Sequence, residues 1–134
     1  MMKDINSRED IARLVNTFYA KVKLDEMLGP IFKAKITSKE AWVEHEIKLT
    51  NFWESTLHFK ATYKGNPVTI HNAVDKGNNY SIDHNHFGRW QLLWIANINE
   101  QFEGDVAQMA KNKARNMAHH LFLRMFQEKP VAKE

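Results

Sequence analysis

The sequence predicts an all-α protein, and three observations support this prediction. Apolar residues recur three or four positions apart along most of the chain, which is the period of a helix with one buried face. No stretch of any length shows the alternation typical of a strand. Only five glycines and three prolines interrupt the 134 residues. We expect one domain over residues 1–134, made of about five or six helices, with a frayed tail from about residue 128.

The first predicted helix follows a cap at Ser7, which with Asp10 forms an acidic variant of the capping box. Tyr19 lies at the edge of the apolar stripe of this helix, so its ring should be buried and its hydroxyl needs a partner. Residues 28–30, Leu-Gly-Pro, are expected to end the helix and to lead into a short turn that contains Phe32.

A second helix is predicted from a capping box at Thr37 and Glu40 to a point near Leu57. One face of this helix carries mostly large apolar residues: Trp42, His45, Leu49, Phe52, Trp53 and Thr56. His45 falls well inside this face and not on the polar side of the helix. A neutral imidazole is unusual on such an apolar face, so its presence calls for an explanation.

The middle of the chain is expected to hold one short helix. Residues 63–67 are typical of a turn in which Asn66 caps and Pro67 is the first helical residue. The helix that follows carries His71 and has little core of its own to cover. The residues from Asp75 to Tyr80 are polar and are expected to form a loop.

Two long helices complete the predicted fold. Ser81 is expected to cap the first of them. Its apolar stripe consists of Phe87, Trp90, Trp94 and Ile98. Gly104 and Asp105 break and restart the chain, and the last helix carries an apolar stripe over residues 106–121.

The composition excludes several classes of function. The absence of cysteine removes disulfides, thiolate metal sites, iron–sulfur clusters, thiol catalysis and haem attached by thioether links. The net charge is +3, but lysine and arginine are scattered among acidic residues, so we expect no nucleic-acid partner. No apolar run approaches a membrane span, and the N-terminus lacks the apolar stretch of a secretory signal. We therefore expect a cytoplasmic protein with no membrane partner.

The seven histidines are the main chemical resource of the sequence. A single histidine on an apolar face is more often a packed core residue than a ligand. Three polar groups on different predicted helices nevertheless point to an interior cofactor: Tyr19, His45 and His71. The apolar groups expected around them are large and flat: Phe18, Phe32, Phe52, Trp53, Phe87 and Trp90.

Other metal sites fit the sequence less well. A di-iron bundle needs a Glu followed three residues later by a His, and the sequence contains no such pair. The His-Glu-x-x-His pattern of zinc proteases, glycine-rich phosphate loops and the Gly-x-Ser-x-Gly elbow are absent as well. The side chains of His84 and His86, and of His119 and His120, diverge on a helix. Of the metal and cofactor sites considered, a haem site accounts best for the histidines.

Five segments stand out in order along the chain, between about residue 5 and residue 125. They are Phe18-Tyr19-x-Lys21-Val22 with Leu28-Gly29-Pro30-Ile31-Phe32, Trp42-x-x-His45, Phe52-Trp53, Tyr63-x-Gly65-Asn66-Pro67-x-x-x-His71, and His86-Phe87-x-x-Trp90. In order and spacing the set resembles the group III truncated haemoglobins. The resemblance implies a truncated globin, which is a two-on-two helical sandwich, and a non-covalently bound haem b with its iron.

The resemblance also implies a role for individual residues. His71 matches the proximal histidine, the protein's bond to the iron. Tyr19 matches the distal tyrosine that hydrogen-bonds the bound ligand, and His45 matches the distal position on the facing helix. Trp90 matches a tryptophan whose indole N–H also points at the ligand. The residues expected to contact the haem are Phe32, Leu49, Phe52, Trp53, Phe87 and Trp90.

One region departs from the family pattern. Between His71 and Trp90 the chain holds several more residues than the shorter family members, and a proline-rich stretch usual there is missing. The insertion is assigned to residues 75–80. It affects the expected geometry of the proximal loop more than the identity of the ligand, for which His84 and His86 are the rivals.

The predicted function is the binding of a diatomic ligand, namely oxygen, nitric oxide or carbon monoxide, at a five-coordinate iron with a polar distal pocket. Stabilising donors favour slow oxygen release, and hence redox chemistry over transport. Peroxidase-like chemistry on peroxide with His45 as acid–base, or oxidation of nitric oxide to nitrate, are hypotheses for the same pocket. We expect a monomer that receives electrons from an unidentified reductase.

Two alternatives stay open. In a haem sensor or carrier, His45 would become a second ligand of the iron. In a cofactor-free helical interaction module, the histidines and aromatic residues would only fill the core, and the purified protein would be colourless.

Overall fold

The computed structural model describes residues 2–60, 67–77 and 82–129. They form six helices: α1 (Arg8–Leu24), α2 (Gly29–Lys35), α3 (Lys39–Leu57), α4 (Pro67–Gly77), α5 (His84–Gln101) and α6 (Asp105–Glu128). Within these ranges there is no strand, so the predicted all-α class is confirmed. None of the helices described is long and apolar enough to cross a membrane.

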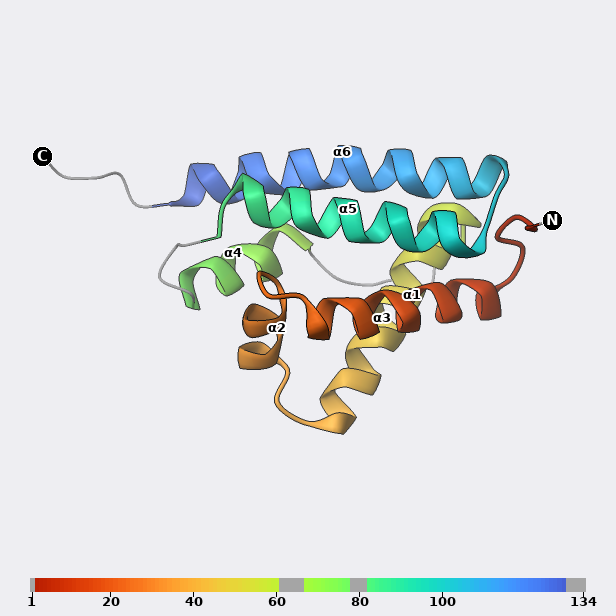
Figure 1. Ribbon diagram of the computed structural model, residues 1–134. Helices are drawn as coiled ribbons and strands as arrows, with labels where there is room; N and C mark the ends of the chain where they lie inside the picture. The colour runs from red at the N-terminus through yellow and green to blue at the C-terminus, as the bar shows by residue number, and fades with distance from the viewer. Residues whose placement is uncertain (1, 61–66, 78–81, 130–134) are drawn as a thin grey trace, which may run out of the picture.

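Two pairs of helices make up the body of the molecule, namely α5 with α6 and α1 with α3 (Figure 1). α5 and α6 run antiparallel and are joined by a tight connection, and α1 packs against α5. α3 crosses α1 at a steep angle. α2 and α4 lie at the end of the body where α1 finishes and α5 starts, and α4 packs against α6.

Side-chain caps determine where the long helices begin. Ser7 caps α1 as predicted. The cap of α3 is Ser38 instead of the predicted Thr37, because the Ser38 hydroxyl accepts a hydrogen bond from the backbone N–H three residues later at 3.0 Å. The cap of α5 is Asp83, whose side chain accepts from the second following N–H at 2.9 Å. The predicted cap, Ser81, lies outside the described residues.

Two segments that we predicted to be a turn and a loop are helical. Residues 29–35 form the short helix α2, with Pro30 in its first turn, where the missing N–H of proline is no loss. α4 starts at Pro67 as predicted but continues to Gly77, so the predicted loop from Asp75 is helical in its first three residues. The rest of that predicted loop, residues 78–80, lies outside the part of the chain described.

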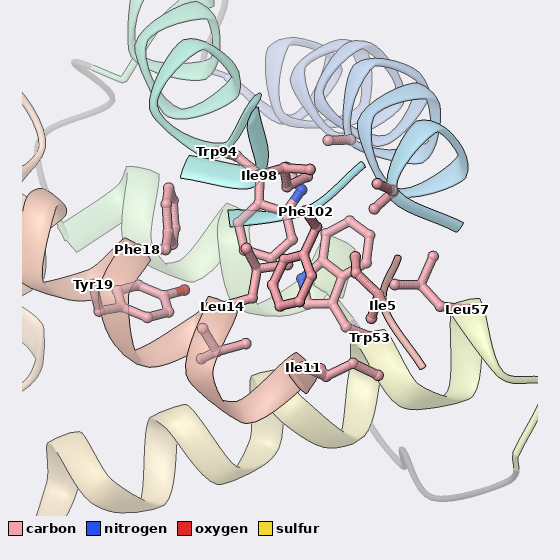
Figure 2. Packing of buried hydrophobic residues seen from close by; sticks show 14 of the residues in the cluster. Ile5, Ile11, Leu14, Phe18, Tyr19, Trp53, Leu57, Trp94, Ile98 and Phe102 are labelled. Atoms are coloured by element: carbon pink, nitrogen blue, oxygen red, sulfur yellow. The ribbon is translucent and has the colours of Figure 1, made fainter. Parts of the chain in front are cut away.

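The hydrophobic core lies where α1, α3, α5 and α6 meet (Figure 2). Trp53 of α3 stacks on Trp94 of α5 with ring centroids 4.6 Å apart, and Phe18 of α1 meets Trp94 edge-on at 5.0 Å. α6 contributes small buried residues, which let its backbone approach the large rings of the other helices: Ala107, Ala110 and Ala114.

The connection between α5 and α6 depends on Gly104, which has a φ of 141° and is the predicted break point. The carboxylate of Asp4 lies against it and caps α6 from the N-terminal segment, accepting from the N–H groups of Val106 and Ala107 at 2.9 and 2.8 Å. A Cβ atom on Gly104 would lie 2.5 Å from Cγ of Asp4. Both the backbone angle and this close approach therefore require glycine.

Candidate functional site

Side chains from three helices meet in one aromatic group, which we call the His45 cluster: Tyr19 of α1, Phe32 of α2, and Trp42 and His45 of α3. The centroid of the His45 ring lies 4.9 Å from that of Tyr19, 6.1 Å from that of Phe32 and 6.0 Å from that of Trp42. All three contacts are edge-to-face, the arrangement that rings prefer in packed interiors. The structure therefore brings together three of the predicted site residues, Tyr19, Phe32 and His45.

A buried carboxylate holds the corner between α1 and α2 and so positions Phe32. Asp25 accepts hydrogen bonds from the N–H of Leu28 at 2.9 Å and from Nε of Arg89 on α5 at 2.7 Å. Burial by itself would raise the pKa of Asp25, but these hydrogen bonds and the positive charge of Arg89 lower it below its ordinary value. The carboxylate stays ionised at neutral pH, and its hydrogen bond with Arg89 connects the turn between α1 and α2 to α5.

His45 carries the unusual electrostatics of the cluster. Its Nε2 atom is buried and has no hydrogen-bond partner among the described residues. Burial lowers the pKa of His45 from 6.5 to about 4, and the positive charges of Lys48 and His71 act in the same direction. The imidazole is therefore neutral at pH 7, and one of its nitrogens is buried without a donor or acceptor within the described chain.

Tyr19 supplies a second polar group beside His45. Its side chain is 4% exposed, and its ring packs edge-on against Phe18 at 5.0 Å. Burial raises the pKa of Tyr19 well above its ordinary value, and the negative charge of Glu46 adds to this shift. The phenol is therefore protonated at any physiological pH and is available as a hydrogen-bond donor.

His71 lies on α4, on the other side of the site. It is half-buried, and its ring is 6.1 Å from that of Phe87 on α5, tilted by 31°. Its positive charge contributes to the lowered pKa of His45. The predicted distal and proximal histidines lie on α3 and α4 respectively.

Trp90 borders the site from α5 and belongs to a stack of indole rings. It lies 6.0 Å from Phe18 and 6.2 Å from Trp94, nearly parallel to the latter, and Trp94 in turn stacks on Trp53. Trp53, predicted to contact the haem, is 1% exposed and lies in the core behind Trp90. The remaining predicted contacts are half-buried: Leu49, Phe52 and Phe87.

The two rival histidines are placed differently. His84 is exposed, and its ring packs against Phe122 of α6 at 6.0 Å. Nδ1 of His86 accepts a hydrogen bond from the N–H of Asp83 at 3.0 Å and so completes the cap of α5. Neither ring has a contact with the His45 cluster among the described residues.

Trp42 is the site residue that our list of predicted contacts lacks. Its ring stacks on Phe32 with centroids 6.4 Å apart, and Nζ of Lys23 lies 4.3 Å above its centroid, which closes the cluster toward solvent with a cation. The sequence contained a signal for this placement, because Trp42 precedes His45 by three residues and so lies on the same helix face.

No protein-family model matches the chain, but a relative and a solved structure do. It is 32% identical over 115 residues to the Group 3 truncated hemoglobin ctb of Campylobacter jejuni, covering 85% of this chain and 87% of that relative. It also matches the crystal structure of group III truncated hemoglobin from Campylobacter jejuni with a TM-score of 0.84 and 29% identity, over 98% of this chain and 100% of that one. The predicted globin fold is confirmed, and the chain belongs to the group III truncated haemoglobin family.

Proposed function

We propose that this globin binds haem b non-covalently between α4 and the His45 cluster, with His71 as the ligand of the iron. Membership of a haemoglobin family gives the chain the capacity to bind haem. The observation that carries the proposal is the buried Nε2 of His45, a polar atom that lies in an aromatic cluster and has no partner among the described residues. A buried polar group without a partner is costly, and it is kept where a ligand completes it.

The residues present fit a haem. A porphyrin is a flat apolar disc, so its site needs apolar walls that are only partly covered by the protein itself. Half-buried side chains of this kind come from α2, α3 and α5: Phe32, Trp42, Leu49, Phe52, Phe87 and Trp90. The iron needs an imidazole ligand, which His71 would provide from α4, and of the two rivals His86 completes a helix cap and His84 is exposed.

When bound, haem would supply a ferrous iron that takes a diatomic ligand. The chain's own residues then act on that ligand. The Tyr19 phenol is protonated and donates a hydrogen bond, and the indole N–H of Trp90 is a second donor. Neutral His45 offers one donor and one acceptor. Each hydrogen bond to a ligand with partial negative charge contributes about 1.5–3 kcal/mol in a site that excludes water.

The electrostatics favour ligand stabilisation over proton transfer as the role of His45. An acid–base residue works best when its pKa lies near the operating pH, and the pKa of His45 is about 4. Several donors slow the release of oxygen, so we infer redox chemistry with oxygen, nitric oxide or peroxide in preference to transport. Such chemistry consumes electrons and requires a reductase as partner.

Absorption spectra of the purified protein test this proposal. The wild type, ferric and then reduced with dithionite, should show an intense Soret band that shifts with carbon monoxide. The His71→Gly variant should lose or reshape this band, and added imidazole should restore it. His84→Gly is the matched control and should keep the wild-type spectrum.

Two outcomes would contradict the proposal in different ways. A wild type that is colourless and takes up no added haemin would remove haem binding and leave the helical interaction module. A reduced wild type that is six-coordinate without added ligand, and becomes five-coordinate in His45→Leu, would make His45 a second iron ligand.

A further inference from the structure

A buried ion pair joins the helix that carries His71 to the end of α6. The carboxylate of Asp75 is 2% exposed, and Nζ of Lys129 lies 3.0 Å from its Oδ1 and 2.8 Å from its Oδ2. The backbone N–H of Ile82, just before α5, donates to Oδ1 at 3.0 Å. One carboxylate thus connects three parts of the chain: α4, the segment that leads into α5, and the residue that follows α6.

This pair bears on His71 because of its place on α4. Asp75 follows His71 by four residues, so the two side chains lie on the same side of the helix, one turn apart. Anchoring Asp75 therefore sets both the rotation of α4 about its axis and its position along that axis. Either displacement would move the His71 imidazole.

The contact between α4 and α6 contains an open hollow beside the ion pair. Of the described helices, α6 is the one against which α4 packs closely. An open hollow of about 290 Å³ lies along their contact, lined by Asn72, Ala73, Asp75, Lys76, Met125 and Glu128. Asp75 lies on its wall, so the ion pair with Lys129 connects α4 directly to the end of α6 beside this hollow.

We propose that Asp75 and Lys129 are positioning residues that hold α4 so that His71 is presented to the haem iron. The proposal rests on the proposed function, because it assigns His71 to the iron. It adds that the orientation of His71 depends on the ion pair between Asp75 and Lys129, which is more than fifty positions later in the chain. Both residues act on His71 through α4.

Two variants test the proposal in the haem-loaded protein. Asp75→Asn removes the charge but keeps the shape and an oxygen acceptor for the N–H of Ile82. Lys129→Met removes the partner charge at a less buried position, and it serves as the second variant if Asp75→Asn fails to fold. Lys21→Met is the control for the loss of a lysine–carboxylate pair elsewhere, because it breaks the more exposed ion pair with Glu100, 2.6 Å long, between α1 and α5.

Two readouts follow the position of His71. The rate of haem loss to an excess of apomyoglobin should rise about tenfold in both variants, as is usual when a group that orients a metal ligand is removed. The iron–histidine stretching band in the resonance Raman spectrum of the ferrous protein should shift or broaden. Lys129→Arg should restore both, and Lys21→Met should differ from the wild type by less than about twofold in the rate of haem loss.

The outcomes separate this inference from the proposed function. A wild type with a normal Soret band, combined with unchanged haem loss and an unchanged Raman band in Asp75→Asn and Lys129→Met, overturns the positioning role alone. Equal acceleration in Lys21→Met also overturns it, because any lost ion pair would then have the same effect. A wild type that binds no haemin overturns the proposed function and this inference together.

Discussion

Replacing His45 with leucine should make the haem-free protein more stable. Nε2 of His45 is buried with no partner in the described chain, and a buried polar group in that state costs about 1–3 kcal/mol. Leucine is similar to histidine in volume, and the surrounding rings of Tyr19, Phe32 and Trp42 are well suited to an apolar side chain. We expect the free energy of unfolding to rise by about 1–3 kcal/mol, and the thermal midpoint by about 3–5 °C for each kcal/mol.

The measurement is urea unfolding of the haem-free protein at pH 7, followed by far-UV circular dichroism, with equal m-values as a requirement for comparison. His58→Leu is the matched control: Nε2 of His58 lies 3.3 Å from the carbonyl oxygen of Ile5, so this variant should lose about 1 kcal/mol. A loss of stability in His45→Leu similar to that in His58→Leu would refute the reasoning, because Nε2 of His45 would then have a partner. A gain would mean that the chain gives up stability to keep this imidazole, as functional sites do.

Three further predictions follow from the same structure. Because the pKa of His45 is about 4 when folded and 6.5 when unfolded, the unfolded state binds more protons between these values, so stability falls as the pH drops from 6.5 to 4. The loss is at most about 3 kcal/mol, and urea titrations at several pH values should show a weaker dependence in His45→Leu. Tyr19→Phe should raise the rate of oxygen dissociation about 10- to 100-fold, which is equivalent to the loss of one donated hydrogen bond. Stopped-flow displacement of oxygen by carbon monoxide measures this rate. An unchanged rate would exclude Tyr19 as a donor. Gly104→Ala should lower the free energy of unfolding by about 2–4 kcal/mol, because alanine is strained at this positive φ and displaces the Asp4 cap. Thermal unfolding measures this change, and a loss below about 0.5 kcal/mol would contradict the close approach of Asp4 to Gly104.

Helical periodicity was enough to predict most of the fold, because each long helix buries one stripe of its own sequence. The helix ends were predicted less well where neighbouring residues compete. Thr37 and Ser38 are both good caps, and sequence alone does not decide between them. Asp83 displaced the predicted cap of α5 because His86 completes its capping box, a pairing that depends on the side-chain nitrogen of a histidine.

The site could be predicted where a polar residue interrupts an apolar face. Tyr19 and His45 were found in this way, and the structure places their rings 4.9 Å apart. Asp75 was missed, since a carboxylate in a polar run is expected in solvent and its partner Lys129 is distant in sequence. Lys129 stands at the start of the tail that was expected to fray, and nothing in the sequence indicated that Asp75 would hold its amine.

The distribution of the indole rings decides how this protein can be studied by fluorescence. All four tryptophans lie in the His45 cluster or in the Trp53–Trp94–Trp90 stack beside it. Haem absorbs strongly at the wavelengths at which indole emits, and all four tryptophans lie near the proposed acceptor. Filling the site should quench almost all intrinsic emission, and a haemin titration read at 340 nm would follow occupancy directly. Tryptophan emission of the haem-loaded protein would therefore be a poor measure of unfolding. An increase in emission would report the release of haem before it reported any loss of structure.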